Sequence, residues 1–544
     1  MWRSSSRATA SASASSPRDA AAERGRQSTL SIITRLQLLD VMLGSVQSSS
    51  SYAILYLDSF TTQVMSNICG ISDLLDYGIS LVDNINNTKP TKQDKIYFIT
   101  PTDANIALLT SRHKHSSNVH VFFTTAPSPF QIEDIKKSGG LLSHLVTLKE
   151  ANVEYVMNPD ARGFTTGPEE ALERFYGHGA ELLGEYDDCI YQIANRLASL
   201  FVTMKEMPSI RYRAALPPDS HEYPHGLESR LLVTQRLAVE LSTLLEHHQE
   251  ANQIPEGETC ELIIVDRGMD PVAPIVHEWT YESMIYDLLA DELTEGRNVY
   301  QGHVLNDKDA MFCKLRHLHF AEASNTITGY CDELQAKSGG RIKNSNVKDM
   351  DLKSMAKLVR GLPKYQDELR SLNVHVDIAS ALNKQIDSGR LTEFGELEQD
   401  VIFGNATSKE LIAFLSSNQL MAESDKLRLL LCYSATHLEK LDETRQSQWQ
   451  KLARLDASNV RCLRNLEYLG VPVCKREGGS LSSMSFGKVK RKKSAVRKER
   501  NVFAMNSDTY SLARFVPLLA VGIKMVFDRA ILSVQPFAAL RRSP

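Results

Sequence analysis

Short runs of β-branched and aromatic residues alternate with helix-length segments between residues 52 and 157. Four runs have the length and composition of buried strands: Tyr52–Leu57, Lys95–Thr100, Val119–Thr124 and Val153–Met157. Segments long enough for a helix lie between them, such as Asp103–Ser111 and Phe130–Lys137. Strands that alternate with helices are typical of a doubly wound parallel sheet, so the sequence predicts an α/β domain here.

A second α/β unit is expected to begin near residue 153. Two segments with apolar residues at helical spacing, Ile190–Lys205 and Glu228–Gln249, precede another strand-like run at Glu261–Asp266. Beyond residue 269 the pattern changes, because helical periodicity dominates from Thr280 to Leu469 and strand signals are few. The sequence therefore predicts two parallel-sheet α/β domains and a large, mainly helical domain.

The helical part contains a break and is followed by a basic run. Helical periodicity is seen in Leu352–Leu362, Tyr365–Ile386 and Leu427–Leu441. Gly339–Asn346 is a polar break that we interpret as the tip of a helical hairpin. In Lys488–Arg500, eight of the thirteen residues are Lys or Arg. Such a run favours a solvated linker, and the alternatives are a contact with acidic lipid or protein, or a nuclear signal.

The composition is typical of a soluble protein with several domains. The 544 residues are too many for one ordinary core, and 42% of them are hydrophobic. The formal net charge of −4 gives no case for nucleic acid or an anionic membrane as the main ligand. The eight cysteines form no C-x-x-C pair, which indicates a reducing compartment and no zinc site.

The sequence contains no segment that we interpret as transmembrane. Charged residues interrupt its most apolar C-terminal stretch, Phe515–Leu540, whereas a spanning helix needs about 20 continuous apolar residues. Residues 1–26 are rich in Ser, Ala and Arg, with their first acidic residue at Asp19. This composition resembles an organellar transit peptide, and a disordered tail or a misplaced start codon are the alternatives.

The sequence contains neither a P-loop motif nor a G-x-S-x-G nucleophile motif. Its densest polar cluster comprises Asp266, Arg267, Asp270, His277 and Glu278. These carboxylates and the histidine could hold a metal, but the zincin pattern H-E-x-x-H fails at Tyr281. In the structural alternative, Asp266 and Asp270 cap the turn and pair with Arg267, Pro271 and Pro274 fix the exit of the chain, and Glu278 lies near a helix start.

The segment that carries this cluster resembles a known family signature. Glu261–Leu289 is similar to the pattern D-R-x-x-D-x-x-x-P-h-x-H-E-h-T-Y-x-x-M-x-x-D-L-L of the SM (Sec/Munc, syntaxin-binding) family. Other similar segments follow the family order: Gly78–Ile85, Ile96–Thr102, Val121–Thr124, Pro208–Ala214, Leu362–Leu369, Leu397–Gly404, Asp425–Leu431 and Leu469–Val473. The resemblance covers about residues 30 to 519. His277–Tyr281 and Lys492–Arg500 resemble the plant, Keule-type branch.

The resemblance implies an arch of three domains. It implies a disordered tail (1–29), α/β domain 1 (30–152), the first part of α/β domain 2 (153–268), helical domain 3 (269–487), a basic linker (488–500) and the second part of domain 2 (501–544). Tyr510–Leu519 resembles the helix that returns the chain to domain 2, and after Leu519 the resemblance stops. We therefore expect an incomplete domain 2 sheet, an aberrant C-terminus, and poor packing of Ala520–Pro544.

In function, the resemblance implies binding and not catalysis, with no cofactor and no metal. The partners would be a syntaxin-type SNARE and SNARE complexes. The protein would be a cytoplasmic, monomeric regulator of vesicle docking and fusion, peripheral to the plasma membrane, secretory vesicles or the cell plate. The alternatives are a metal-dependent hydrolase that uses Asp266, Asp270, His277 and Glu278, and a truncated, non-functional isoform. Neither the cognate syntaxin nor the direction of regulation follows from the sequence.

The resemblance also implies two partner-binding sites on domain 1. The pocket for the syntaxin N-terminal peptide would contain Ile132, Leu148 and Glu150, although the first two could be core residues of an amphipathic helix. The cleft would contain Gln63, Gly70 and Asp83. Basic residues are usual in the family where Gln63 and Gly70 stand, so binding of a closed, acidic syntaxin is less expected than binding of SNARE complexes. The signature residues Asp266, Arg267, Asp270, Pro274, His277, Glu278 and Tyr281 would be structural.

Overall fold

The computed structural model describes fifteen segments of the chain. They are residues 29–46, 52–88, 91–111, 117–157, 163–165, 170–177, 179–180, 184–213, 233–294, 299–306, 309–337, 366–437, 443–471, 512–520 and 537–539. Two compact units divide the chain. The N-terminal unit comprises Met1–Pro168, Tyr191–Pro208 and Glu240–Cys260, and the C-terminal unit comprises Glu169–Ile190, Ser209–Val239 and Glu261–Pro544.

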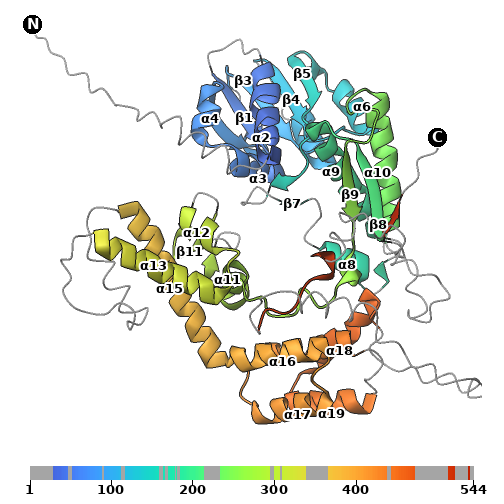
Figure 1. The fold of residues 1–544 in the computed structure, drawn as a ribbon. Coiled ribbons are helices and arrows are strands. Elements are labelled where there is room, and N and C mark those ends of the chain that lie inside the picture. Colours follow the sequence, from blue (N-terminus) through green and yellow to red (C-terminus); the bar gives the residue numbers. More distant parts are fainter. Residues whose placement is uncertain are drawn as a thin grey trace, which may run out of the picture. The chain divides into compact units, whose positions relative to one another are not determined.

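The N-terminal unit is built on a five-stranded parallel sheet of order β2-β1-β3-β4-β5 (Figure 1). The strands are β1 (Ala53–Leu57), β2 (Ile79–Asn84), β3 (Asp94–Ile99), β4 (Val119–Phe123) and β5 (Leu145–Glu150). The flanking helices are α2 (Thr29–Leu36), α3 (Ser59–Ile68), α4 (Ile71–Asp76), α5 (Asp103–Ser111), α6 (Pro129–Lys137) and α7 (Gly139–Leu142). This architecture confirms the predicted doubly wound α/β fold.

Apolar side chains project from both faces of the sheet. Along β1, Leu55 and Leu57 join one buried cluster, and Ile54 and Tyr56 join another. Successive side chains of a strand point to opposite faces, so the two clusters are cores on the two faces of the sheet. Because the central strands are buried on both faces, they carry the continuous apolar runs that predicted them from the sequence.

The edge strands β2 and β5 were not predicted. Both are only partly buried, and they expose apolar residues such as Leu81, Val82, Val146 and Leu148. Their apolar runs are therefore shorter than those of the central strands. The strand predicted at Val153–Met157 is mostly wrong: only β6 (Val156–Met157) pairs, with β7 (Phe164–Thr165), although the whole segment is largely buried.

A three-stranded sheet of order β13-β8-β9 lies in the C-terminal unit. It contains β8 (Pro208–Arg213), β9 (Cys260–Ile264) and β13 (Phe537–Ala539), which is antiparallel to β8. The predicted strand at Glu261–Asp266 thus corresponds to β9. Near this sheet in the sequence are α8 (Ala171–Tyr176), α9 (Gly184–Met204) and α10 (Val233–Glu250), and the last two confirm the predicted amphipathic helices.

The rest of the C-terminal unit is mainly helical, as predicted. Its first part contains α11 (Tyr281–Leu288), α12 (Ala310–Leu315), α13 (Phe320–Lys337) and α15 (Gln366–Gly389). The second part contains α16 (Leu391–Phe403), α17 (Ser408–Ser417), α18 (Glu423–Thr436), α19 (Glu443–Ala453) and α20 (Ala457–Asn465). The long helices α13 and α15 lie side by side (Figure 1). Helices α15 and α18 match two of the predicted helices.

One feature of the helical part was not predicted, and three predicted features lie outside the described residues. A small antiparallel sheet was not predicted: β10 (Leu293–Thr294), β11 (Val299–Tyr300) and β12 (His303–Val304). These strands have two residues each, too few for a pattern of alternation. The predicted helix Leu352–Leu362, the hairpin tip Gly339–Asn346 and the basic run Lys488–Arg500 lie outside the described residues.

The helix predicted at Tyr510–Leu519 is wrong, because residues 513–517 form an irregular segment. Pro517 disfavours helical geometry in the residue before it, which explains part of the difference. The segment is also fixed by other contacts: Phe515 is buried in the core formed with α16–α20, and Arg514 pairs with Asp400 at 2.9 Å. Strand β13 lies after Leu519 and pairs with β8, so this part of the chain contributes to the sheet. The poor packing expected for the other residues of Ala520–Pro544 stays a prediction.

No helix within these described segments is long and apolar enough to cross a bilayer.

Candidate partner-binding surfaces and the signature segment

The carboxyl ends of β1, β3 and β4 meet a buried polar cluster. Asp58, directly after β1, caps α3 and accepts hydrogen bonds from the backbone N–H of Thr61 (2.8 Å) and Thr100 (2.7 Å). The side chain of Asn105 donates to the same carboxylate at 2.8 Å. The strand order reverses between β1 and β3, and α/β proteins bind small ligands at this place.

Side chains of α9 contact polar residues that follow the strands β4 and β5. Asn195 Nδ2 donates to Thr125 Oγ1 at 3.1 Å, and Arg196 Nε lies 3.6 Å from Glu154 Oε1. Glu154 is buried, and burial raises the pKa of its carboxyl to about 7 although Arg196 opposes the shift. The Asp58 carboxylate at the switch point is hydrogen-bonded within the fold, which suits a structural role more than a ligand site.

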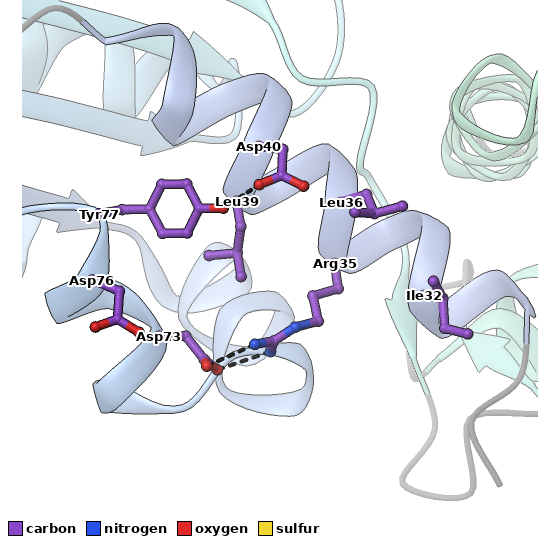
Figure 2. Close-up of a pocket in the computed structure, with 8 residues that line it drawn as sticks. All are labelled: Ile32, Arg35, Leu36, Leu39, Asp40, Asp73, Asp76 and Tyr77. Carbon is purple, nitrogen blue, oxygen red and sulfur yellow. Dashed lines mark hydrogen bonds and ion pairs between the residues drawn. The ribbon is translucent and has the colours of Figure 1, made fainter. Parts of the chain in front are cut away.

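A cavity of about 350 Å³ lies at the surface of the N-terminal unit (Figure 2). Its lining residues are Ile32, Arg35, Leu36, Leu39, Asp40, Asp73, Asp76 and Tyr77. Arg35 forms a bidentate ion pair with Asp73, with N–O distances of 2.6 and 2.8 Å, and donates to the carbonyl of Ile68 at 3.1 Å. The hydrogen bond to Asp73 raises the pKa of Arg35. Tyr77 donates to Asp40, so the cavity combines these polar groups with the apolar side chains of Ile32, Leu36 and Leu39.

The three predicted cleft residues lie in the same unit. Gln63 is exposed on α3, and Gly70 is the exposed N-cap of α4. The N–H of Gly70 donates to Asp73 Oδ2 at 2.7 Å, so the carboxylate that binds Arg35 also binds Gly70. Asp83 is half-buried on β2 and accepts from Asn87 Nδ2 at 2.9 Å. Sequence reasoning missed Arg35, which supplies a cation beside Gly70 from 35 positions earlier in the chain.

Exposed apolar side chains occur on both helices that contribute to the cavity. Leu36, which ends α2 and lines the cavity, is 49% exposed. Ile71 is 79% exposed and Leu75 is 53% exposed on α4, which contributes Asp73 and Asp76 to the lining. Single exposed apolar residues are common, but exposed apolar residues on both helices offer surface that an apolar partner could cover.

The predicted peptide-pocket residues lie on β5 and α6. Leu148 and Glu150 are exposed on the edge strand β5 and share one face of it with Val146, which is 58% exposed. Ile132 is half-buried on α6, two residues after Phe130, which is 85% exposed. The alternative that Leu148 is a core residue of a helix is wrong, because it is a partly exposed strand residue.

The signature segment begins with a turn that is fixed by ion pairs and hydrogen bonds. Asp266 pairs with Arg213 of β8 and is the N-cap of a short 3₁₀ turn, Arg267–Met269. Arg267 donates to the backbone carbonyl of Asp270 at 2.7 Å, which corrects the predicted pairing with a carboxylate. The Arg267 guanidinium thus stabilises the turn by a hydrogen bond to its main chain.

Asp270 joins two distant parts of the C-terminal unit. Its Oδ1 accepts from the N–H groups of Val272 and Ala273, each at 3.2 Å, and its Oδ2 accepts from the N–H of Leu518 at 2.8 Å. The side chain is buried. The structure therefore connects the signature to the segment at 512–520, which explains why a carboxylate is useful at this position.

The later signature residues also have structural partners. His277 Nδ1 lies 2.8 Å from Glu398 Oε2 of α16, and both side chains are buried. Glu278 accepts from the backbone of Thr280 and Trp279, and Tyr281 hydrogen-bonds His375 at 2.9 Å. Pro274 is exposed in the loop before them.

The metal-dependent hydrolase alternative needs Asp266, Asp270, His277 and Glu278 to converge. In the part of the chain that the structure describes, these four side chains do not gather as a set of metal ligands. Each of them has a different partner, as given above. The geometry therefore favours the structural reading of the signature.

Comparison with known proteins gives a family match over most of the chain. The Sec1 family model matches residues 53–543. The match extends past Leu519, which corrects the end at residue 519 read from the sequence. Among curated proteins, the chain is 34% identical to Protein transport Sec1a of Arabidopsis thaliana, over 90% of this chain and 73% of the relative. It is 32% identical to the SNARE-interacting protein KEULE of the same plant, over 92% and 77%.

Solved structures show the same fold. The Unc18–syntaxin 1 complex from Monosiga brevicollis matches with a TM-score of 0.73 and 20% identity, over 94% of this chain and 88% of that chain. The SM protein Vps45 in complex with the Qa SNARE Tlg2 matches with a TM-score of 0.66 and 18% identity, over 94% and 87%. At these identities the likeness concerns the fold.

Proposed function

The chain belongs to the Sec1 family, and we propose that it is a syntaxin-binding regulator of vesicle docking and membrane fusion in secretion. The family match over residues 53–543 carries this proposal. The similarity to a SNARE-interacting plant protein extends it to fusion at the cell plate during cytokinesis. The protein would act in the cytoplasm and reach the plasma membrane or secretory vesicles through its SNARE partners. The domain boundaries at residues 152, 268 and 487 belong to the same proposal.

The protein would work by binding and not by catalysis. At the switch point of the N-terminal sheet, where an α/β enzyme would hold its substrate, the carboxylate of Asp58 is hydrogen-bonded to Thr61, Thr100 and Asn105. The polar signature residues are engaged in hydrogen bonds and ion pairs within the C-terminal unit. A binding protein needs no reactive group, only a surface that holds one conformation of its partner better than another.

Two surfaces of the N-terminal unit would contact the SNARE. The face of β5 with Leu148 and Glu150, together with Ile132, would take an extended N-terminal peptide, because an exposed edge strand can pair with one. The surface around Gln63, Gly70 and Asp83, with the cavity beside Arg35, would take a helical part of the partner. Arg35 is the one cation among the lining residues, but it is paired with Asp73, and Asp40 and Asp76 line the same cavity. We therefore propose that binding of an acidic syntaxin is weakened.

A pull-down tests this function directly. The purified chain is mixed with several plasma-membrane-type syntaxins that have intact N-termini, and with an unrelated helical protein of similar charge as control. We expect at least one syntaxin to be enriched over the control. Enrichment of none of them would exclude the proposal.

A further inference from the structure

Three potential metal ligands gather in the helical part of the C-terminal unit, and none of them belongs to the partner-binding surfaces proposed on the N-terminal unit. They are His303 of β12, Asp309 before α12 and His375 of α15. One ligand atom from each lies within 4.8 Å of the other two. We propose that these side chains form a zinc site.

The carboxylate of Asp309 is oriented for such a site. Its Oδ1 accepts hydrogen bonds from the backbone N–H of Met311 (2.9 Å) and Phe312 (3.0 Å) at the start of α12, and from Ser371 Oγ (2.9 Å). Its Oδ2 faces the two imidazoles, with His303 Nε2 at 2.6 Å and His375 Nε2 at 3.1 Å. One oxygen is thus held by the fold, and the other is directed between two nitrogen ligands.

The distances fit zinc after a small expansion. Tetrahedral Zn²⁺ binds nitrogen and oxygen ligands at about 2.0–2.1 Å, which places the ligand atoms about 3.3 Å from one another. The two N–O distances of 2.6 and 3.1 Å therefore need to open by about 0.7 Å and about 0.2 Å, the larger change falling on His303, whose side chain is partly exposed. Without metal, the same groups form hydrogen bonds, with each Nε2–H donating to Oδ2.

A second layer of contacts orients His375. Its Nδ1 lies 2.9 Å from the hydroxyl of the buried Tyr281. A metal-binding histidine usually donates its other ring N–H to a neighbouring oxygen, which fixes the tautomer and the ring plane. The Tyr281 oxygen can accept that proton when Nε2 binds the ion, and can donate to Nδ1 when Nε2 keeps its hydrogen.

The ligand types select the ion and its coordination. Two imidazoles and one carboxylate suit zinc and similar transition metals, whereas Ca²⁺ and Mg²⁺ prefer oxygen ligands. His375 and Asp309 are buried, but the side chain of His303 is 20% exposed, so the site opens to solvent on that side. Water would take the fourth position.

The ion would connect two neighbouring segments to a helix that comes much later in the sequence. Strand β12 and the N-cap of α12 would share one ligand sphere with His375 of α15, 66 positions after Asp309. Helix α15 lies beside α13, so the site would hold β12 and the start of α12 against this helix pair. A ligand that binds only the folded state stabilises it, so zinc would raise the thermal midpoint.

The test uses the full chain after metal removal with a chelator. Titration with Zn²⁺ by calorimetry, and with Co²⁺ by visible absorption, measures stoichiometry and geometry. We expect one equivalent of each ion, a tetrahedral Co²⁺ spectrum without a thiolate charge-transfer band, and a thermal midpoint raised by about a few degrees with Zn²⁺.

The variant His303→Gln separates a metal site from a hydrogen-bonded network. The glutamine amide can still donate to Asp309, but it is a poor zinc ligand, so the variant should fold and lose affinity by about tenfold or more. His317→Gln, which changes an exposed histidine outside the cluster, should bind zinc as the parent does. The proposal fails if the parent shows no saturable binding at micromolar Zn²⁺, or if His303→Gln binds the ion as tightly as the parent.

Discussion

The edge of the N-terminal sheet and the signature segment of the C-terminal unit differ in how their side chains are used. On β5, Leu148 and Glu150 are exposed at the side of the sheet that has no further strand. In the signature, Asp270 and His277 are buried and bound to residues more than 100 positions away. The segment most typical of the family therefore holds the fold together, whereas the surfaces available to a partner have little sequence signal.

The largest effect is expected for a substitution in the signature segment. Asp270→Ala would leave the N–H groups of Val272, Ala273 and Leu518 without their acceptor, so we expect a loss of about 3 kcal/mol in the free energy of unfolding. Denaturant unfolding measures it, with Asp291→Ala at an exposed position as control. A loss of syntaxin affinity at unchanged stability would instead place Asp270 in a binding site.

The buried carboxyl of Glu154 in the N-terminal unit gives the next largest effect. Burial raises the pKa of Glu154 from 4.5 to about 7, so the folded chain binds this proton more tightly than the unfolded chain. The contribution to stability is complete below about pH 4.5 and is lost as the pH rises through 7. Glu154→Gln should therefore stabilise the protein above pH 7, by on the order of 2 kcal/mol, and have little effect near pH 4.5.

Thermal unfolding across this pH range checks the Glu154 prediction. Glu258→Gln, an exposed carboxyl of the same unit, is the matched control and should show no such pH dependence. A glutamine variant that is less stable than the parent above pH 7 would mean that the Arg196 ion pair outweighs the cost of burial.

A smaller effect is expected at the cavity beside α4. Arg35→Gln keeps hydrogen-bond donors but removes the charge next to Gly70, so the association rate with an acidic SNARE partner should fall by about tenfold at low salt. Stability should change by less than about 1 kcal/mol, because the ion pair with Asp73 is partly exposed. Stopped-flow binding at several salt concentrations measures the rate, and Lys137→Gln is the control. An unchanged association rate would mean that this cavity is not part of the surface that binds the SNARE.

The smallest effect is expected at the rim of the peptide site. Glu150→Lys reverses an exposed charge on β5, so we expect the affinity for a syntaxin N-terminal peptide to fall by about threefold to fivefold, with no change in stability. Titration of a labelled peptide measures it, and Glu258→Lys serves as the control. Equal affinity in Glu150→Lys and the parent would mean that the peptide does not bind beside Glu150 on β5.

The sequence predicted the parts of the fold whose signal is local. The central strands were predicted because continuous apolar runs mark buried strands, and the helix Asp103–Ser111 was predicted because a helix-length segment separates two of them. The edge strands were missed because their partial burial shortens the apolar run. The helix predicted at Tyr510–Leu519 was wrong because Pro517 and the Leu518–Asp270 hydrogen bond favour another course of the backbone.

The candidate sites were predicted unevenly for a similar reason. The residues taken from the family pattern could be placed one by one, but their neighbours in space could not. Arg35 reaches Asp73 from 38 positions away, and His277 reaches Glu398 from 121 positions away. No local pattern links such pairs, so the cation beside Gly70 and the buried partner of His277 required the structure.

The most direct test compares both regions in one measurement. The affinity of one cognate syntaxin with an intact N-terminus is determined by calorimetry for the parent chain, for Arg35→Gln combined with Glu150→Lys, and for Asp270→Ala at a temperature at which it is folded. We predict one-to-one binding by the parent, binding weaker by at least about tenfold in the double variant, and parental affinity in Asp270→Ala. Parental affinity in the double variant together with lost binding in folded Asp270→Ala would contradict this account.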